Sequence, residues 1–302
     1  MSLYRDRLSY VTNAPELLEK FWGMRGADVK PLGRGMNSEI WVAEHQGSTY
    51  VVKRVPSTQI AGLIVGCEIA STLAQVGLVT GRPVPTTDGT LVLNEHGVAL
   101  LEHVSGRELE GETDQEQRWI AATLSRVHVA GKPASGPSTA TFMVDWLSPQ
   151  LPGAEAHPWL VPLIEAVRAE TEPLHVTWST VHTDPAPEVF VHNDRTGVTG
   201  LIDWSGAQRG PVLYDVASAV MYLGGTDDAT AFLDTYRAHG PLGSDEMQLL
   251  DAFRRFRWAV QAAYFAFRLA SHDLTGIADQ AENEKGLDDA RRGLAALGLD
   301  TN

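Results

Sequence analysis

The segments Val181-His182-Thr183-Asp184 and Ile202-Asp203-Trp204 decide how this sequence is interpreted. Between them, two apolar β-forming runs at 189–191 and 198–202 flank a turn-rich stretch, His192-Asn193-Asp194-Arg195-Thr196-Gly197. Apolar runs on either side of Asn, Asp and Gly are typical of a β-hairpin. In an antiparallel pair, the start of the first strand lies beside the end of the second. We therefore expect the carboxylates of Asp184 and Asp203 to lie in one neighbourhood.

Two neighbouring carboxylates at strand ends suit one general base and one metal ligand, the pairing that phosphoryl transfer needs. Taken alone, an Asp beside a Pro or after a strand is more often a turn or capping residue. The hairpin, the position of His182 two residues before Asp184, and the features upstream together favour the chemical interpretation.

Composition limits the classes of protein to consider. The 302 residues are enough for two lobes of ordinary size, and 43% hydrophobic with 21% charged residues is typical of a globular protein. The single cysteine, Cys67, excludes an internal disulfide, and there is no Cys/His pattern for zinc. A net charge of −14 argues against nucleic acid or an anionic membrane as a partner and is compatible with a cationic small molecule. Residues 1–7 lack the apolar segment of a signal peptide, and no apolar run approaches the length of a membrane span, so we expect a cytoplasmic protein.

The chain divides into a strand-rich part and a helical part. Before residue 105 we expect hairpins at 40–43 with 50–55 and at 91–93 with 98–104, and one helix at 64–76. After Ser105-Gly106 the helical period dominates, at 115–129 and most clearly at 249–269. In that last helix the apolar residues favour one side, and Arg254, Arg255, Arg257 and Gln261 are assigned to others. The predicted domains are 1–104 and 105–302, with a small-molecule site between two lobes.

Two upstream features suit a phosphate-bearing ligand. Glycines in the segment Gly33-Arg34-Gly35-Met36-Asn37-Ser38 let backbone amides approach phosphates closely, although such a segment is more often an ordinary turn between strands. It matches no Walker loop, and no βαβ unit supports a dinucleotide-dependent oxidoreductase. Lys53 closes an apolar strand and either binds α/β-phosphates or is an edge lysine. Glu68, in the helix that follows, either pairs with Lys53, as in kinases, or is an exposed helix residue.

Taken in order, these segments, the connector Leu100 to Gly106 and the later Tyr214-Asp215-Val216-Ala217 resemble the aminoglycoside phosphotransferase and choline kinase-like family of small-molecule kinases. The resemblance covers nearly the whole chain. It implies an α+β, two-lobed protein-kinase-like fold, with a small β-rich N-lobe and a larger, mostly helical C-lobe. It also implies transfer of the γ-phosphate of ATP or GTP, with magnesium, to a hydroxyl of a small molecule.

The resemblance implies a role for each matching residue. Asp184 would be the catalytic base and Asp203 would hold magnesium, whereas His182 and Asp215 would support the loop. The backbone of Glu102 to Val104 would receive the adenine. The implied nucleotide-binding residues are Gly33, Gly35, Asn37, Ser38, Lys53, Glu68, Glu102, His103 and Val104.

The chain departs from the family pattern around the base. Thr183 stands where the family usually has Gly, and Val189 stands where it usually has a magnesium-binding Asn. The intervening Pro185-Ala186-Pro187 stiffens a loop that is one residue shorter. Glu188, a hard oxygen ligand, either replaces that Asn on magnesium or faces solvent and leaves Asp203 as the metal ligand.

The acceptor is the least specified part of the prediction. We expect a small hydroxyl compound, with a cationic one favoured: an aminoglycoside-like antibiotic, an amino-sugar or an amino alcohol. Acids of its pocket would come from helices of the C-lobe, and the candidates are Asp227, Asp228, Asp273 and Asp279. The altered loop motivates a second hypothesis, a kinase-fold protein that binds nucleotide or ligand without turnover. The sequence predicts no oligomeric state.

Overall fold

The computed structural model describes residues 14–35 and 38–301, which form two compact units. The N-terminal unit runs to Ser105 and also takes in Ile202–Gly206. The C-terminal unit comprises Gly106–Leu201 and the chain from Ala207 onward. The predicted boundary after residue 104 lies directly beside the first division. The sequence did not predict that the segment around Asp203 belongs with the N-terminal unit.

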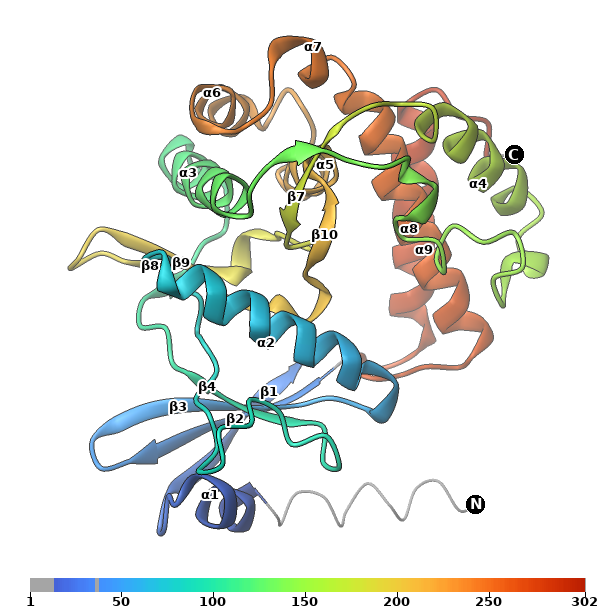
Figure 1. The fold of residues 1–302 in the computed structure, drawn as a ribbon. Helices are drawn as coiled ribbons and strands as arrows, with labels where there is room; N and C mark the ends of the chain where they lie inside the picture. The colour runs from blue at the N-terminus through green and yellow to red at the C-terminus, as the bar shows by residue number, and fades with distance from the viewer. Residues whose placement is uncertain (1–13, 36–37, 302) are drawn as a thin grey trace. The chain divides into compact units, whose positions relative to one another are not determined.

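The N-terminal unit is built on an antiparallel sheet in the order β1-β2-β3-β4 (Figure 1). The β2–β3 hairpin is confirmed, and its turn uses positive φ at Gln46 (50°) and Gly47 (80°), as tight hairpins require. Two helices accompany the sheet. The elements are α1 (Ala14–Trp22), β1 (Asp28–Gly35), β2 (Ser38–His45), β3 (Ser48–Arg54), the 3₁₀ turn η1 (Ser57–Gln59), α2 (Ile60–Gln75) and β4 (Val98–Glu102).

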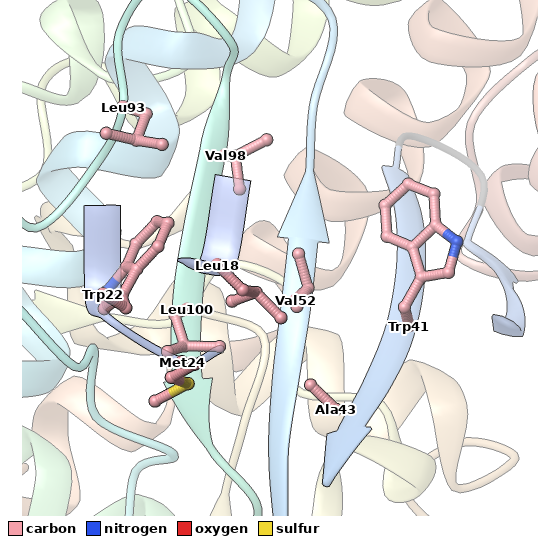
Figure 2. Packing of buried hydrophobic residues seen from close by; sticks show 9 residues of the cluster. All are labelled: Leu18, Trp22, Met24, Trp41, Ala43, Val52, Leu93, Val98 and Leu100. Atoms are coloured by element: carbon pink, nitrogen blue, oxygen red, sulfur yellow. The ribbon is translucent and has the colours of Figure 1, made fainter. Parts of the chain in front are cut away.

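Apolar side chains of the sheet and of α1 form one core of this unit (Figure 2). Its members are Leu18, Trp22, Met24, Trp41, Ala43, Val52, Leu93, Val98 and Leu100. A second cluster joins Leu63 and Cys67 of α2 to Ala99 of β4. Burial raises the pKa of the Cys67 thiol to about 12, so Cys67 is a small apolar core residue, as expected.

The second predicted hairpin, 91–93 with 98–104, is wrong. Only a single bridge joins Leu93 to Val98, and residues 91–93 form no strand. The positions beside β4 are taken by residues 82–84 instead: Val84 N–H donates to the Leu100 carbonyl (2.7 Å), and Glu102 N–H donates to the Arg82 carbonyl (2.9 Å). A strand offers only two edges, so this earlier segment displaces the local partner.

Helix α2 with the turn before it, Ser57–Gln75, is long and apolar enough to cross a membrane by length and composition. The sequence analysis expected no such run, so that expectation is corrected. Length and composition do not distinguish a membrane span from the core helix of a folded lobe. In the structure Leu63, Cys67 and Ala70 of α2 are buried in the N-terminal unit.

The C-terminal unit is mostly helical, with two small antiparallel sheets ordered β10-β7-β6 and β5-β8-β9 (Figure 1). Helix α8 packs against α4, α5 and α9, and α3 packs against α6. The helices are α3 (Asp114–Ala130), α4 (Leu160–Thr171), α5 (Val212–Tyr222), α6 (Thr230–His239), α7 (Ser244–Met247), α8 (Leu250–Ala270) and α9 (Gln280–Ala296). The strands are β5 (Arg107–Glu108), β6 (Ala134–Ser135), β7 (Thr177–Val181), β8 (Phe190–Asn193), β9 (Val198–Leu201) and β10 (Gln208–Pro211).

The hairpin predicted between Asp184 and Asp203 is confirmed. Strands β8 and β9 pair antiparallel from Phe190 with Leu201 to Asn193 with Val198. The turn contains Gly197 at a φ of 69°, a conformation that glycine adopts without strain. Asp184 lies before β8 in the C-terminal unit, whereas Asp203 lies after β9 in the N-terminal unit. The proximity of their carboxylates therefore stays a prediction.

Candidate active site

Lys53 and Asp203 form the polar centre of the N-terminal unit. Lys53 lies in β3, between Ile40 of β2 and Ala99 of β4, and is 5% exposed. Its Nζ donates a hydrogen bond to Oδ1 of Asp203, whose side chain is 47% exposed. A buried ammonium needs a carboxylate partner, and Asp203 supplies it. The ion pair between Lys53 and Glu68 is not formed, because Glu68 lies on the exposed side of α2.

Two glycines hold helix α2 against the backbone that follows Asp203. A Cβ on Gly66 would lie 2.2 Å from the Trp204 carbonyl oxygen, and one on Gly62 would lie 2.8 Å from the Ser205 carbonyl oxygen. The Trp204 indole Nε1–H also donates to the Thr80 carbonyl (3.1 Å). The absence of side chains thus permits a helix-to-backbone contact that fixes the position of Asp203. The sequence analysis missed these glycines, and their spacing of four residues, which puts both on one helix face, was the available signal.

The glycine-rich segment forms the end of one strand and the start of the next. Gly33 and Gly35 lie in β1, opposite Ile40 and Ser38, after a register shift between Pro31 and Gly33. Ser38 begins β2 and is buried. Asn37 lies outside the described residues. A role for this segment on phosphates stays a prediction.

The connector leaves the sheet after Glu102. The Glu102 carboxylate pairs with Arg82 (2.7 Å), and its backbone N–H is already used by the Arg82 carbonyl. His103 and Val104 follow outside the strand. A role for the backbone of Glu102 to Val104 in receiving a nucleotide base stays a prediction.

In the C-terminal unit, buried Asp215 of α5 anchors the loop that carries Asp184. The Asp215 carboxylate accepts the backbone N–H groups of His182 (2.6 Å) and Thr183 (2.8 Å). Asp215 is fully buried and His182 is 1% exposed. These contacts give both residues the supporting position that the resemblance implies.

A buried histidine and tyrosine complete the anchor. His128 Nε2 lies 3.1 Å from the Asp215 carboxylate, and its Nδ1 lies 2.6 Å from the Tyr236 hydroxyl. Burial raises the pKa of Tyr236 well above its ordinary value, so the hydroxyl keeps its proton and donates a hydrogen bond to Nδ1. The imidazole Nε2–H then donates to Asp215, which makes a continuous buried network.

Thr183 occupies a conformation that glycine would adopt more easily. Its φ is 76°, in the left-handed region, where a β-branched residue is a genuine outlier at a cost of about 1–3 kcal/mol. Such strain persists only where the surroundings impose it, and here the hydrogen bond from Thr183 N–H to Asp215 does so. Thr183 therefore departs from the family pattern at the cost of backbone strain, and the hydrogen bond to Asp215 holds it in this conformation.

Asp184 is held by two side chains that the sequence analysis did not include in the site. Its side chain is 64% exposed, and its Oδ1 accepts hydrogen bonds from the Tyr222 hydroxyl and from Nη2 of Arg257 (3.1 Å). The sequence assigns Arg257 to a side of its helix other than the apolar one, but Arg257 is 7% exposed and lies on the buried face. Arg257 follows Phe253 by four residues and precedes Val260 by three, so its spacing matched the buried face.

Magnesium is the metal that the resemblance implies, and the donors present suit it. Mg²⁺ in phosphoryl-transfer sites is held by one or two carboxylates together with substrate phosphates. Asp203 is a partly exposed carboxylate, and Glu188 lies exposed in the 3₁₀ turn η4 (Pro187–Val189). Within residues 14–35 and 38–301 no group of three or more His, Cys, Asp or Glu forms an all-protein metal cage.

The four acids proposed for the acceptor divide into two groups. Asp273 lies 3.5 Å from the buried guanidinium of Arg268, and Asp279 caps α9 by accepting the Ala281 N–H (2.9 Å). These two have structural roles. Asp227 and Asp228 are exposed in the segment between α5 and α6 and stay candidates.

Comparisons with known proteins identify the fold. The chain is similar to amicoumacin kinase hAmiN, solved with AMP-PNP, Ca²⁺ and amicoumacin, at 15% identity and a TM-score of 0.74, covering 98% of this chain and 97% of that one. It is similar to the choline kinase LicA from Streptococcus pneumoniae at 18% identity and a TM-score of 0.70 (96% and 99% covered). A microcompartment-associated aminopropanol kinase gives 15% identity and a TM-score of 0.68 (97% and 100% covered). The predicted α+β, protein-kinase-like fold is thereby confirmed.

No curated protein sequence matches the chain. A family model does match: the model of the phosphotransferase enzyme family, APH, covers residues 28–254. That range runs from the start of β1 into α8 and contains Lys53, Asp184, Asp203 and Asp215. The chain therefore belongs to the phosphotransferase enzyme family, whose members phosphorylate hydroxyl groups of small molecules.

Proposed function

We propose that this phosphotransferase transfers the γ-phosphate of ATP or GTP to a hydroxyl of a small acceptor, with Asp184 as the base. The observation that carries the proposal is the Asp184 carboxylate, which is exposed on a loop that Asp215 anchors through two buried hydrogen bonds. An exposed carboxylate on a rigid support can meet a substrate hydroxyl in a defined geometry.

Each residue has a part in the proposed reaction. Asp184 accepts the proton of the acceptor hydroxyl while the hydroxyl oxygen bonds to the γ-phosphorus and the bond to the β-phosphate oxygen breaks, releasing the nucleoside diphosphate. Lys53 steadies the α/β-phosphates, and Asp203, with Glu188 as a second candidate, holds the metal. Bound Mg²⁺ would neutralise charge on the β- and γ-phosphates. The β8–β9 hairpin predicts the proximity of Asp184 and Asp203 that the reaction needs.

The acceptor that we propose is a small, cationic hydroxyl compound: an aminoglycoside-like antibiotic, an amino-sugar or an amino alcohol. The net charge of −14 supports a cationic compound. The similar solved proteins are named for amicoumacin, choline and aminopropanol. We also propose that the protein acts in the cytoplasm, without a nucleic-acid or membrane partner.

A kinase-fold protein that binds nucleotide or ligand without turnover is the second candidate. The observation that favours it is Thr183, a strained residue directly before Asp184 in a loop that is one residue shorter than the family pattern. Against it, Lys53, Asp184 and Asp203 are all present, and a protein without turnover has no chemical need for all three.

The proposal is tested by calorimetric titration of ATP and GTP with and without magnesium. We expect magnesium-dependent binding of at least one nucleotide to wild type and its loss in Asp203→Asn, because the isosteric amide still accepts a hydrogen bond from Lys53 but carries no charge for the metal. Asp194→Asn, which changes an exposed acid in the β8–β9 turn, is the matched control and should bind as wild type does. No magnesium-dependent binding of either nucleotide would refute the assignment.

A further inference from the structure

Within residues 14–35 and 38–301, the carboxylate of the proposed base, Asp184, is held by hydrogen bonds to only one of its two oxygens. Both recorded side-chain bonds, from the Tyr222 hydroxyl and from Arg257 Nη2, end on Oδ1. Among the residues that the structure describes, none donates a hydrogen bond to Oδ2. A carboxylate with a 64% exposed side chain would otherwise sample several rotamers, so these two donors decide where Oδ2 points.

Arg257 is itself fixed on every nitrogen of its guanidinium. Nε donates to the Ser218 hydroxyl (3.0 Å), Nη1 donates to the Gln261 side-chain carbonyl (3.0 Å), and Nη2 donates to Tyr222 and Asp184. The partners come from α5 and from the next turn of α8. A planar fork that is bonded at all three nitrogens has one orientation, so it can orient whatever it binds.

Stability alone does not account for this arrangement. Removing a guanidinium from water costs several kcal/mol unless a close charge compensates it. Within the described residues, the one carboxylate paired with Arg257 is that of Asp184, which is itself mostly in water. Burial acts to lower the pKa of Arg257, but its neighbours, with Asp184 as the charged one, outweigh burial, so the pKa lies above its ordinary value and the charge persists.

Tyr222 is the second donor, at the C-terminal end of α5. Its hydroxyl donates to Asp184 Oδ1 and accepts from Arg257 Nη2 (3.0 Å), which closes a three-membered ring of contacts. Burial raises the pKa of Tyr222, so the hydroxyl keeps its proton and stays a donor. The ring makes Oδ1 the anchoring oxygen.

We propose that Arg257 and Tyr222 are positioning residues that hold Oδ1 of Asp184, so that Oδ2 is the atom that receives the acceptor hydroxyl. The inference rests on the proposed function, since it assumes that Asp184 is the base. Catalysis of phosphoryl transfer depends mainly on positioning, so a base whose carboxylate is held by one oxygen suits this reaction.

The test measures magnesium-dependent phosphate release from the nucleotide that binds, with water as the acceptor, in single and double variants. Tyr222→Phe removes one hydrogen-bond donor and keeps the aromatic side chain. We expect kcat to fall about 10- to 100-fold, the effect of losing a hydrogen bond to a charged group. The nucleotide KM should stay within about twofold, because the proposed nucleotide residues lie in the other unit. Arg257→Met should lower kcat at least as much, and Arg257→Lys should recover part of the loss because it restores the charge.

Two comparisons separate positioning from a merely structural role. Arg255→Met removes an arginine from the same helix that pairs with Glu170 and not with Asp184, so it should lower the melting temperature without lowering kcat selectively. In an Asp184→Asn background, Tyr222→Phe should cost almost nothing further, because residues that act through one another are not additive. A Tyr222→Phe protein with wild-type kcat, while Asp184→Asn is inactive, would overturn the positioning role alone. An Asp184→Asn protein with wild-type turnover would overturn the proposed function and the inference with it.

Discussion

The structure predicts whether Gly66→Ala raises or lowers the stability of the protein. In an ordinary helix interior, replacing Gly by Ala stabilises a protein by about 1 kcal/mol, because Ala loses less backbone entropy on folding. Here the new Cβ would lie 2.2 Å from the Trp204 carbonyl oxygen and 2.7 Å from its carbonyl carbon, whereas ordinary contact begins at 3.4 Å. Helix α2 and the Trp204 backbone would have to separate by about 1.2 Å at this point.

That separation is resisted from both sides. Trp204 is 5% exposed and its indole is bonded to the Thr80 carbonyl, while Leu63 and Cys67, on the adjacent face of α2, are buried in the core of the N-terminal unit. Overpacking of this kind costs about 1–3 kcal/mol, which outweighs the gain in helix propensity. We therefore expect a net loss of stability of roughly 1–2 kcal/mol and weaker magnesium-dependent nucleotide binding, because Asp203 directly precedes the displaced residue.

Chemical denaturation followed by fluorescence measures the change, and calorimetry measures the binding. Val65→Ala is the matched control, since it shortens an exposed side chain on the same helix and should leave both quantities unchanged. A Gly66→Ala protein that is more stable than wild type would refute the close contact between α2 and the segment after Asp203.

Three further predictions follow from the ion pairs and the buried network. Lys53→Met should weaken nucleotide binding at least tenfold, whereas Glu68→Gln should change it less than twofold, because Glu68 is exposed and does not pair with Lys53. Calorimetric titration of both variants measures this, and a tenfold loss of affinity in Glu68→Gln would contradict the structure. Asp215→Ala should destabilise the protein by about 3 kcal/mol or more in denaturant melts, because it leaves the buried N–H groups of residues 182 and 183 unpaired. Burial opposes the charge of Glu116, but hydrogen bonds from Arg107 and from two backbone N–H groups outweigh it and lower its pKa. The stabilisation by ionised Glu116 is therefore fully present above the unfolded pKa of about 4.3 and is lost as pH falls through the lower folded pKa. Glu116→Gln should lower the free energy of unfolding by about 1–3 kcal/mol near pH 7, and by less as the pH is lowered. A loss of stability that does not depend on pH in denaturant melts would contradict this.

Local patterns predicted those elements whose partners are close in sequence. The β2–β3 and β8–β9 hairpins each combine two β-forming runs with a turn that contains Gly, so the pairing is decided within a few residues. The long helix at 249–269 was predicted for the same reason, because the apolar period persists over its whole length.

Long-range competition accounts for the errors. Residues 91–93 lost their expected partner because residues 82–84 pair with β4 instead. Lys53 does not pair with Glu68 because Asp203, 150 residues further along the chain, reaches its ammonium. Arg257 was assigned to a side other than the apolar one, although its spacing from Phe253 matched the buried face, and its burial depends on partners in α5. Such partners are set by tertiary packing, which single-sequence periodicity does not contain.

The most direct test of the central claim is to look for a phosphorylated product. Purified protein would be incubated with magnesium and the nucleotide that binds, against a panel of aminoglycosides, amino-sugars, amino alcohols and water, with product detected by phosphorus NMR. The account predicts a phosphate ester with at least one acceptor, formed by wild type and lost in Asp184→Asn while nucleotide binding is retained. Tight nucleotide binding with no transfer to any acceptor, water included, would contradict it and favour a kinase-fold protein that binds without turnover.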